Sequence, residues 1–249
     1  MEMINDVLGY KNMKIYQNTD FFSFSLDSII LANFSTIRLR DKKIVDFCTG
    51  NAIVPLIMSR RTKSRIIGVE IQKKLCDLAK KSINQNKLSD YIEIVNSDIK
   101  EFSNNNCNSF DLVLCNPPYF KNEGKSIKNL SYEKMVARHE VLIDLDGVVD
   151  CAKRVLKDNG TFCMVHRSDR LIEIIDCFKK NNIEPKKIKF IYNNIDSNST
   201  LVLIEGQKAG KCGLIVDKPL ILHDLEGNDT EEYKKLQEVI NNDTEKLWW

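Results

Sequence analysis

The sequence predicts an α/β fold of the doubly wound type: a mostly parallel, seven-stranded sheet with an antiparallel final strand and helices on both faces. Two patterns predict it. Between residues 43 and 206, apolar segments of strand length alternate with helical segments, the order expected of βαβ units. Near the end of this region, two apolar segments are joined only by the polar residues 193–199, and strands joined by so short a loop must be antiparallel.

We expect a single domain of 249 residues, because no interdomain linker interrupts the pattern. Its parts are an N-terminal lid and helix over residues 1–42, a core over residues 43–206, and a C-terminal strand and helix over residues 207–249. The aromatic segment 14–24 could cover either the core or a bound ligand. A short apolar helix over residues 28–34 follows it, with Asp27 as the expected N-cap.

The composition points to a reducing setting. The eight cysteines form no C-x-x-C pair and lie mostly in apolar segments, where a reduced thiol behaves as a small hydrophobe. This pattern argues against a zinc site, so we expect no bound metal. We find no signal-peptide pattern and no apolar stretch of membrane-spanning length, and we expect a cytoplasmic protein. The net charge is only +2, so a polyanion must be met by a local basic patch.

The first two core strands carry features of a nucleotide-binding unit. The strand 43–47 is followed by a turn with the single glycine Gly50 and then by a helix over residues 53–60. The dinucleotide pattern G-x-G-x-x-G is absent, so the turn suits a cofactor that lacks phosphates. The second strand, residues 65–70, ends in Glu70, and a carboxylate at this place can accept hydrogen bonds from both ribose hydroxyls.

Further candidate ligand contacts follow the second and third strands. Ile71 could pack on the face of an adenine ring. A helix over residues 72–86 and a strand over residues 91–95 then lead to Asp98, another carboxylate at a strand end. Asp98 could accept the exocyclic amine of an adenine, or it could simply cap a helix that begins at Ile99. The sequence leaves both interpretations open.

The fourth strand, residues 110–114, leads into the bend Cys-Asn-Pro-Pro-Tyr at residues 115–119. Two prolines fix φ and remove two backbone donors, so the bend presents carbonyls without local N–H partners. In an α/β sheet, ligands bind at the carboxyl ends of the strands. The Asn116 amide oxygen and the proline carbonyls can accept both hydrogens of a planar NH2 group, and the Tyr119 ring can stack on it. The alternative is a turn that merely ends a strand.

The remaining segments complete the pattern. Residues 120–129 show no periodicity and are expected to form a loop. Beyond them we expect a helix over residues 145–156 capped by Asp144, a turn at 158–160, a strand over 161–165, a helix over 169–181, strands over 188–192 and 200–204, an edge strand within 214–222, and a terminal helix over 229–240.

The glycine turn, the two carboxylates and the Asn-Pro-Pro-Tyr bend, in this order, resemble the Rossmann-like class I S-adenosylmethionine-dependent methyltransferases. Most of the chain is similar to the bacterial tRNA1(Val) adenine-37 N6-methyltransferase family. The matching stretches are Tyr16-Gln17, Phe22 to Ser28, Cys48 to Asn51, Gly68 to Gln72, Cys115 to Phe120, Ala137 to Glu140, and Val165 to Arg167. Ala52 departs from the family pattern, which has glycine there; alanine is strained if this position needs a positive φ.

This resemblance implies S-adenosylmethionine as the cofactor and N6-methylation of adenine 37 in a tRNA anticodon loop as the reaction. It implies that the glycine turn wraps the methionine end of the cofactor, that Glu70 holds the ribose and that Asp98 holds the adenine. The expected cofactor-binding residues are Asp27, Asp46, Cys48, Gly50, Asn51, Glu70, Ile71, Asp98, Ile99 and Asn116. The expected catalytic residues are Asn116, Pro117, Pro118 and Tyr119.

The chemistry of an aromatic amine explains the bend. The N6 lone pair is delocalised into the adenine ring, so N6 is a poor nucleophile. Acceptors on both N–H bonds, supplied by Asn116 and the Pro117 carbonyl, pull the nitrogen toward tetrahedral geometry and expose the lone pair. Tyr119 can stack on a base turned out of its loop. A general-base role for His139 or His166 is disfavoured, because the methylated amine loses its proton readily.

Basic residues near the bend are expected to contact RNA, and tRNA is the expected partner: Lys121, Lys125, Lys128, Arg138 and Arg167. The nearest alternative is a protein N5-glutamine methyltransferase acting on release factors, because a glutamine amide also presents a planar NH2 group. That family usually carries an N-terminal helical domain, for which the residues before Lys43 leave no room. A non-catalytic RNA-binding module is the alternative from another class, favoured only by Ala52. A homodimer is a further possibility.

Overall fold

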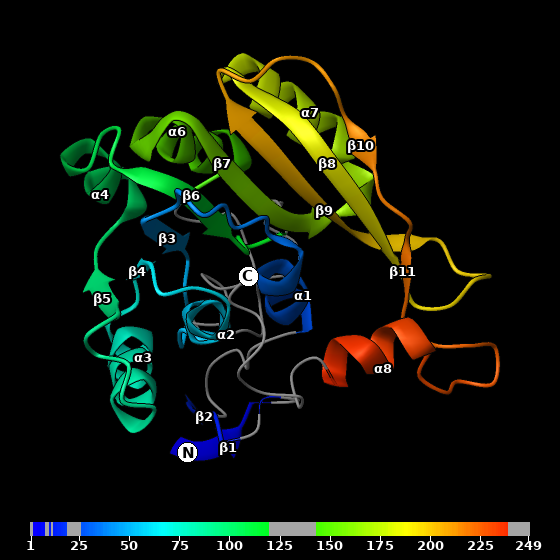
Figure 1. The fold of residues 1–249 in the computed structure, drawn as a ribbon, viewed down its shortest axis with the longest axis horizontal. Helices are drawn as coiled ribbons and strands as arrows, with labels where there is room; N and C mark the ends of the chain where they lie inside the picture. Colours follow the sequence, from blue (N-terminus) through cyan, green and yellow to red (C-terminus); the bar gives the residue numbers. More distant parts are fainter. Residues whose placement is uncertain (1, 8–9, 11, 19–25, 120–142, 239–249) are drawn as a thin grey trace, which may run out of the picture.

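The structure, a computed structural model, describes residues 2–7, 10, 12–18, 26–119 and 143–238. A nine-stranded sheet lies at its centre, in the order β10-β8-β9-β7-β6-β3-β4-β5, with β11 also paired to β8 (Figure 1). Its strands are β3 (Lys43–Phe47), β4 (Arg65–Glu70), β5 (Ile92–Asn96), β6 (Phe110–Cys115), β7 (Leu156–Arg167), β8 (Ile183–Tyr192), β9 (Ser199–Lys208), β10 (Ile215–Val216) and β11 (Leu220–Ile221).

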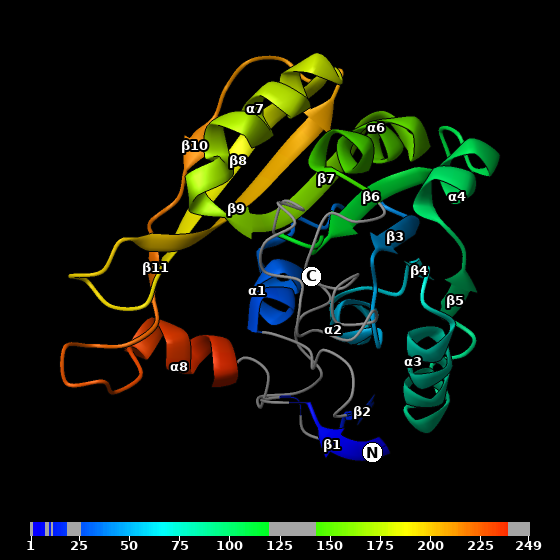
Figure 2. The ribbon, with the colours of Figure 1, turned by 180° about the vertical axis from the view of Figure 1, so that it is seen from behind.

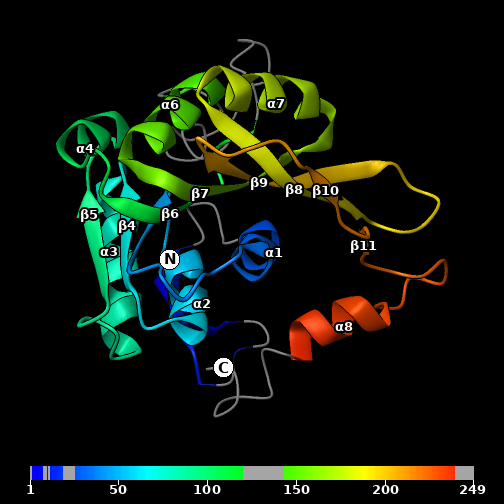
Figure 3. The same ribbon diagram turned by 45° about the horizontal axis from the view of Figure 1, so that its top comes forward.

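Helices cover both faces of the sheet, as predicted (Figure 3). One face carries α1 (Leu26–Phe34), α2 (Ile53–Arg61) and α3 (Lys73–Gln85); the other carries α4 (Ile99–Asn105), α6 (Leu145–Val155) and α7 (Leu171–Lys180). The short helix η1 (Ser168–Arg170) precedes α7, which runs alongside β8 and β9 (Figure 2). The helix α8 (Glu231–Glu238) follows β11. None of the helices in the described part of the chain is long and apolar enough to cross a bilayer.

The strand directions confirm the predicted α/β class. The strands β3, β4, β5, β6 and β7 pair parallel, whereas β9 pairs antiparallel with both β7 and β8. The two-residue strands β10 and β11 both pair parallel with β8 and extend the seven predicted strands to nine. Residues 214–222 do extend the edge of the sheet, as predicted, but as two short strands instead of one. The separation follows from Pro219 just before β11, because proline supplies no N–H to a ladder.

The turn predicted at residues 158–160 was wrong. These residues lie within β7, which starts at Leu156, and the pairing of β6 with β7 shifts register between Phe110 and Leu112. Asn159 there has φ 63°, a left-handed conformation that asparagine tolerates. A bulge accommodates the extra residues without ending the strand.

The N-terminal segment forms a hairpin that sequence patterning did not predict. The strands β1 (Glu2–Asp6) and β2 (Lys14–Asn18) pair antiparallel, so the first part of the aromatic segment 14–24 is a strand, while residues 19–24 lie outside the described residues. The Tyr16 N–H donates to the Ser82 hydroxyl of α3 at 2.9 Å, and the Asn86 side chain bonds both backbone groups of Lys14. The hairpin is thus docked on α3.

Two predicted helix caps had different outcomes. Asp144 caps α6 as predicted, accepting a hydrogen bond from the Gly147 N–H at 2.9 Å. The prediction that Asp27 is an N-cap was wrong, because α1 begins at Leu26 and Asp27 lies within its first turn. Its carboxylate contacts the bend after β6, where it lies 2.9 Å from the Tyr119 hydroxyl.

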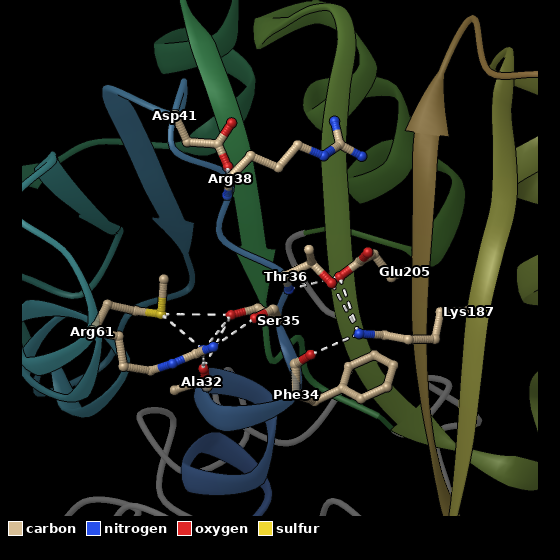
Figure 4. A network of polar contacts seen from close by, with 10 residues as sticks. Ala32, Phe34, Ser35, Thr36, Arg38, Asp41, Arg61, Lys187 and Glu205 are labelled. Atoms are coloured by element: carbon tan, nitrogen blue, oxygen red, sulfur yellow. Dashed lines mark hydrogen bonds and ion pairs between the residues drawn. The ribbon is translucent and has the colours of Figure 1, made fainter. Parts of the chain in front are cut away.

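The carboxyl end of α1 is held by Arg61 of α2 (Figure 4). The Arg61 guanidinium donates to the backbone oxygens of Ala32 and Ser35 and to the Ser35 hydroxyl. These carbonyls belong to the last turn of a helix and the residue beyond it, where backbone acceptors lack intrahelical partners. The charged donor therefore satisfies the helix end and ties α1 to α2.

Two further charged residues hold the chain just past α1. Lys187 of β8 donates to the Phe34 carbonyl and to the Thr36 hydroxyl, both at 3.0 Å, and lies 3.7 Å from the Glu205 carboxylate. Glu205 of β9 accepts from the Thr36 N–H at 2.8 Å. Figure 4 shows the two side chains meeting at this segment. The opposite end of α1, which carries Asp27, is thereby fixed relative to the sheet.

Candidate active site

Most of the predicted site residues lie at or just beyond the carboxyl ends of β3, β4, β5, β6 and β7. These ends lie at the same edge of the sheet, because the five strands run parallel. The structure therefore brings together segments that are far apart in the sequence: the glycine turn, Glu70, Asp98, the bend at residues 116–119, and His166 with Arg167.

Glu70 holds the glycine turn in place. Its two carboxylate oxygens accept hydrogen bonds from the Gly50 N–H and the Gln72 N–H, both at 2.9 Å, and the side chain is only 5% exposed. Gly50 has φ 58°, and a Cβ added there would meet no atom within 4 Å, so glycine is favoured here by backbone conformation. Burial raises the pKa of Glu70. These contacts of Glu70 with the turn were not predicted from the sequence.

Asp46 lies at the buried side of the same turn. The side chain is 1% exposed, and its Oδ2 has no hydrogen-bond partner. Burial raises the pKa of Asp46 to about 8, and the nearby Glu70 carboxylate adds to the rise. A buried acceptor without a donor is costly unless a ligand supplies one. These buried carboxylate oxygens are acceptors and therefore fit a cofactor with hydroxyl and ammonium donors.

Ala52 stands where the family pattern has glycine, and its backbone does have a positive φ. Its φ is 71° and ψ 29°, at the N-cap of α2, and its N–H donates to the Thr49 carbonyl at 2.9 Å. The side chain is fully buried. A left-handed conformation costs an alanine roughly 1–2 kcal/mol, so this turn is held in shape by its surroundings.

The other residues of the turn are placed around it. Cys48 is half-buried and also has a positive φ of 55°. Asn51 is buried, and its amide donates to the Tyr16 carbonyl of β2 at 3.4 Å. Gly68 of β4 lies directly beneath, since a Cβ there would come within 2.8 Å of the Thr49 hydroxyl. The glycine turn is thus packed on β4 and on the N-terminal hairpin.

The ends of β4 and β5 are joined by Asn96, which was not among the predicted site residues. Its amide donates to the Glu70 carbonyl at 2.8 Å and to the Ile71 carbonyl at 2.9 Å. Ile71 is 40% exposed beside it, whereas Ile99 is buried in the core. For Asp98 the capping interpretation is confirmed: its carboxylate accepts from the Lys100 N–H at 2.8 Å. A contact between Asp98 and adenine stays a prediction.

The bend after β6 is built together with the start of α1. The Asn116 amide nitrogen donates to the Ser28 hydroxyl at 2.9 Å. The Tyr119 hydroxyl lies 2.5 Å from the Asn116 amide oxygen and 2.9 Å from the Asp27 carboxylate, so its single hydrogen can be donated to either of them. Burial and the Asp27 carboxylate raise the pKa of Tyr119 well above its usual range, so the hydroxyl keeps its proton. Asp27 thus contacts the bend.

Arg170 of η1 is a further residue of the site that sequence patterning missed. Its guanidinium donates to the Tyr119 carbonyl at 3.2 Å and forms an ion pair with Glu173 at 2.6 Å. The side chain is largely buried. In the sequence it falls in a stretch expected to be helical, with nothing to show that it faces the bend; the fold alone places it there.

His166 lies at the end of β7 and its ring is 5.1 Å from the Tyr119 ring. It is fully buried; its Nδ1 accepts from the Arg167 N–H at 2.8 Å, and its Nε2 has no hydrogen-bond partner. Burial lowers the pKa of His166 to about 4, so the imidazole is neutral at physiological pH.

Arg167 pairs with Asp169 at 2.5 Å. The other basic residues expected to contact RNA lie outside the described residues: Lys121, Lys125, Lys128 and Arg138.

Comparisons with known proteins identify proteins to which this chain is similar. A tRNA1(Val) (adenine(37)-N6)-methyltransferase from Haemophilus influenzae is 26% identical over 234 residues, covering 91% of this chain and 94% of that protein. One of the same name from Phocaeicola vulgatus is 24% identical over 202 residues, covering 81% and 84% of the two chains.

Solved structures show the same fold at low sequence identity. A predicted O-methyltransferase from Agrobacterium tumefaciens superimposes with a TM-score of 0.68 at 17% identity, covering 85% of this chain and 95% of that chain. The Pyrococcus horikoshii protein TYW2, solved in complex with MeSAdo, gives a TM-score of 0.59 at 14% identity, covering 84% and 72%. The sequence profile of the methyltransferase small domain matches residues 25–191. This match spans more than half of the chain, which therefore belongs to the methyltransferase small domain family.

Proposed function

We propose that this protein transfers the methyl group of S-adenosylmethionine to N6 of an adenine in a tRNA anticodon loop, at position 37 and in tRNA-Val. The observation that carries the proposal is the Asn116 amide, held between Ser28 and Tyr119 at the end of β6. The neighbouring strand β3 leads into the glycine turn that Glu70 holds. The names of the relatives support the tRNA substrate. Such a substrate places the proposed reaction in the cytoplasm.

The buried carboxylates are proposed to hold the cofactor. The free Oδ2 of Asp46 can accept from an ammonium group, and Glu70 can accept ribose hydroxyls with its remaining lone pairs. Ile71, half exposed beside them, can pack on an adenine. When bound, S-adenosylmethionine supplies an electrophilic methyl group. The family match and the orphaned acceptor support this assignment.

The bend is proposed to hold the methyl-accepting amine. The Asn116 amide oxygen accepts one N–H and the Pro117 carbonyl accepts the other, which directs the nitrogen lone pair away from both acceptors. Pro118 keeps the bend rigid, because its ring fixes φ. Tyr119 stacks on the base. Arg170 supports this arrangement by holding the Tyr119 carbonyl. Positioning and fixed dipoles of this kind can supply several kcal/mol of barrier lowering.

The proposal is tested by methyl transfer from radiolabelled S-adenosylmethionine. In vitro transcribed tRNA-Val is compared with the same transcript carrying guanine at position 37 and with a purified release factor. We expect label in the first alone. Label in the release factor instead would favour the N5-glutamine methyltransferase. No label and no cofactor binding by calorimetry would favour the RNA-binding module.

The single domain and the homodimer stay predictions. Light scattering would measure whether the protein is a dimer.

A further inference from the structure

The Tyr119 hydroxyl lies between two acceptors that come from different parts of the chain. The Asp27 carboxylate, on the first turn of α1, is 2.9 Å away. The amide oxygen of Asn116, in the bend after β6, is 2.5 Å away. Asp27 and Tyr119 are 92 residues apart in the sequence. Because α1 is anchored at its other end by Arg61, the position of Asp27 is set by the fold.

A tyrosine hydroxyl carries a single hydrogen, so it can make only one strong donated bond at a time. Burial keeps this hydroxyl protonated, because it raises the pKa of Tyr119 well above its usual range. The Asn116 amide nitrogen is already directed to Ser28, which turns the amide oxygen toward Tyr119. The acceptor that the amine needs is therefore in contact with a competing donor.

A bound amine changes this competition. Its N–H needs the Asn116 oxygen, and an oxygen engaged at 2.5 Å by Tyr119 is a poorer acceptor for a second donor. A carboxylate is the stronger alternative for the tyrosine hydrogen, because hydrogen bonds to ionised groups are about twice as strong as neutral ones. With Asp27 present, the hydroxyl can turn to the carboxylate without leaving any polar atom unpaired.

We propose that Asp27 is a positioning residue: it takes the Tyr119 hydroxyl hydrogen when the amine binds and so frees the Asn116 amide oxygen to accept from the amine. No covalent bond forms or breaks in this step; one O–H hydrogen bond changes its acceptor. The inference rests on the proposed function, since it assumes that Asn116 accepts from the methylated amine.

The same contacts would also be present if Asp27 served only to hold the tyrosine ring in place. The two roles differ in what happens when the hydroxyl is removed. If Asp27 acts by drawing off the hydroxyl hydrogen, it becomes dispensable in the Tyr119→Phe background. If it only holds the ring through this hydrogen bond, Tyr119→Phe loses as much activity as Asp27→Ala. A double-mutant cycle separates the two roles.

The experiment measures single-turnover methylation of tRNA-Val transcript by four proteins: the wild type, Asp27→Ala, Tyr119→Phe and the double variant. We expect Asp27→Ala to lower the rate by about tenfold or more, on the scale of one hydrogen bond to a charged group. We expect Tyr119→Phe to keep most of the activity. We expect the double variant to recover to within about threefold of Tyr119→Phe, because no hydroxyl hydrogen remains for Asp27 to accept.

Two controls complete the test. Asp27→Asn keeps an acceptor oxygen and should lose less activity than Asp27→Ala, and Asp77→Ala, exposed on α3, should behave as wild type. Calorimetric binding of the anticodon stem-loop without cofactor gives a second readout: Asp27→Ala should bind more weakly and the double variant should not. A double variant as slow as Asp27→Ala overturns the inference. An inactive wild type instead overturns the proposed function, so the two failures are distinguishable.

Discussion

The Asn116 amide nitrogen donates to the Ser28 hydroxyl at 2.9 Å, across 88 positions of sequence. This bond orients the amide, because it assigns the nitrogen to α1 and leaves the oxygen on the side of Tyr119. The catalytic assignment of the bend therefore depends on a helix that precedes the first core strand.

Asn116 is expected to act mainly on turnover, because its interaction with the amine strengthens as the nitrogen becomes tetrahedral. Asn116→Ala should lower kcat by about 10²-fold or more, the scale of removing one preorganised polar partner, with cofactor binding largely kept. Tyr119→Ala should lose activity with the ring, while Tyr119→Phe should not. Single-turnover methylation of tRNA, with far-UV circular dichroism as a folding control, measures these effects. A fully active Asn116→Ala would rule out the mechanism.

Glu70→Ala is expected to weaken S-adenosylmethionine binding by roughly 1.5–3 kcal/mol, the scale of charge-assisted hydrogen bonds. The loss has two sources, because Glu70 also holds the Gly50 N–H. Calorimetry measures the affinity, and Glu93→Ala on the exposed side of β5 is a matched control. Unchanged affinity in a folded Glu70→Ala protein would contradict the ribose assignment.

Ala52→Gly is expected to change the free energy of unfolding by less than about 1 kcal/mol, because relief of the left-handed strain offsets the lost methyl group and the added freedom of the unfolded chain. Ala32→Gly is the matched control: Ala32 is also fully buried but lies within α1. It should cost about 2 kcal/mol, from helix propensity and the lost methyl group. Urea unfolding measures both, and equal losses would show that position 52 is unstrained.

His166 is expected to make stability depend on pH. Burial lowers its pKa from 6.5 to about 4, so the unfolded chain binds the extra proton between these values. Above pH 6.5, His166 is neutral in both states and the folded protein has its full free energy of unfolding. As the pH falls toward about 4, protonation of the unfolded chain lowers that free energy. Between about pH 7.5 and pH 5, the wild type should lose about 2 kcal/mol more of its free energy of unfolding than His166→Gln does.

The comparison with His166→Gln is needed because Asp46 has the opposite effect. Burial raises the pKa of Asp46 to about 8, so its folded form gains stability as the pH falls. That contribution is present in both proteins and cancels in the difference. Urea titrations at the two pH values give the four free energies, and an identical pH dependence of both proteins would mean that His166 is not buried as a neutral imidazole.

Lys125 and Lys128 are expected to contribute to tRNA binding through phosphate contacts. Replacing Lys125 and Lys128 by glutamine should reduce the slope of log affinity against log salt by about 1.5–2 units. Filter binding at several salt concentrations measures this slope. Lys42 and Lys43, exposed at the amino end of β3, are the matched pair for the control variant. If both double variants show the wild-type slope, tRNA binds elsewhere.

The sequence by itself determined the order of the strands and helices and the places where Gly50, Glu70 and Asn116 follow strand ends. Hydrophobic periodicity and proline chemistry are local properties, and parallel pairing then brings these ends to one edge. The elements that were predicted wrongly or missed depend on strand pairing instead. The strand β7 continues through Asn159 only because β6 lies beside it with a bulge. The strand β1 exists only because β2 pairs with it.

Only the tertiary structure decided which side chains meet at the site. Asp27 reaches Tyr119, Ser28 reaches Asn116, and Arg170 reaches the Tyr119 carbonyl. Neither propensity nor spacing reports such contacts, because they depend on where α1 and η1 pack on the sheet. The position of α1 is set in turn by a distant charged residue: Arg61 of α2 binds the chain at the carboxyl end of α1. Burial, which shifts the pKa of His166 and Asp46, likewise arises only when the whole chain has folded around them.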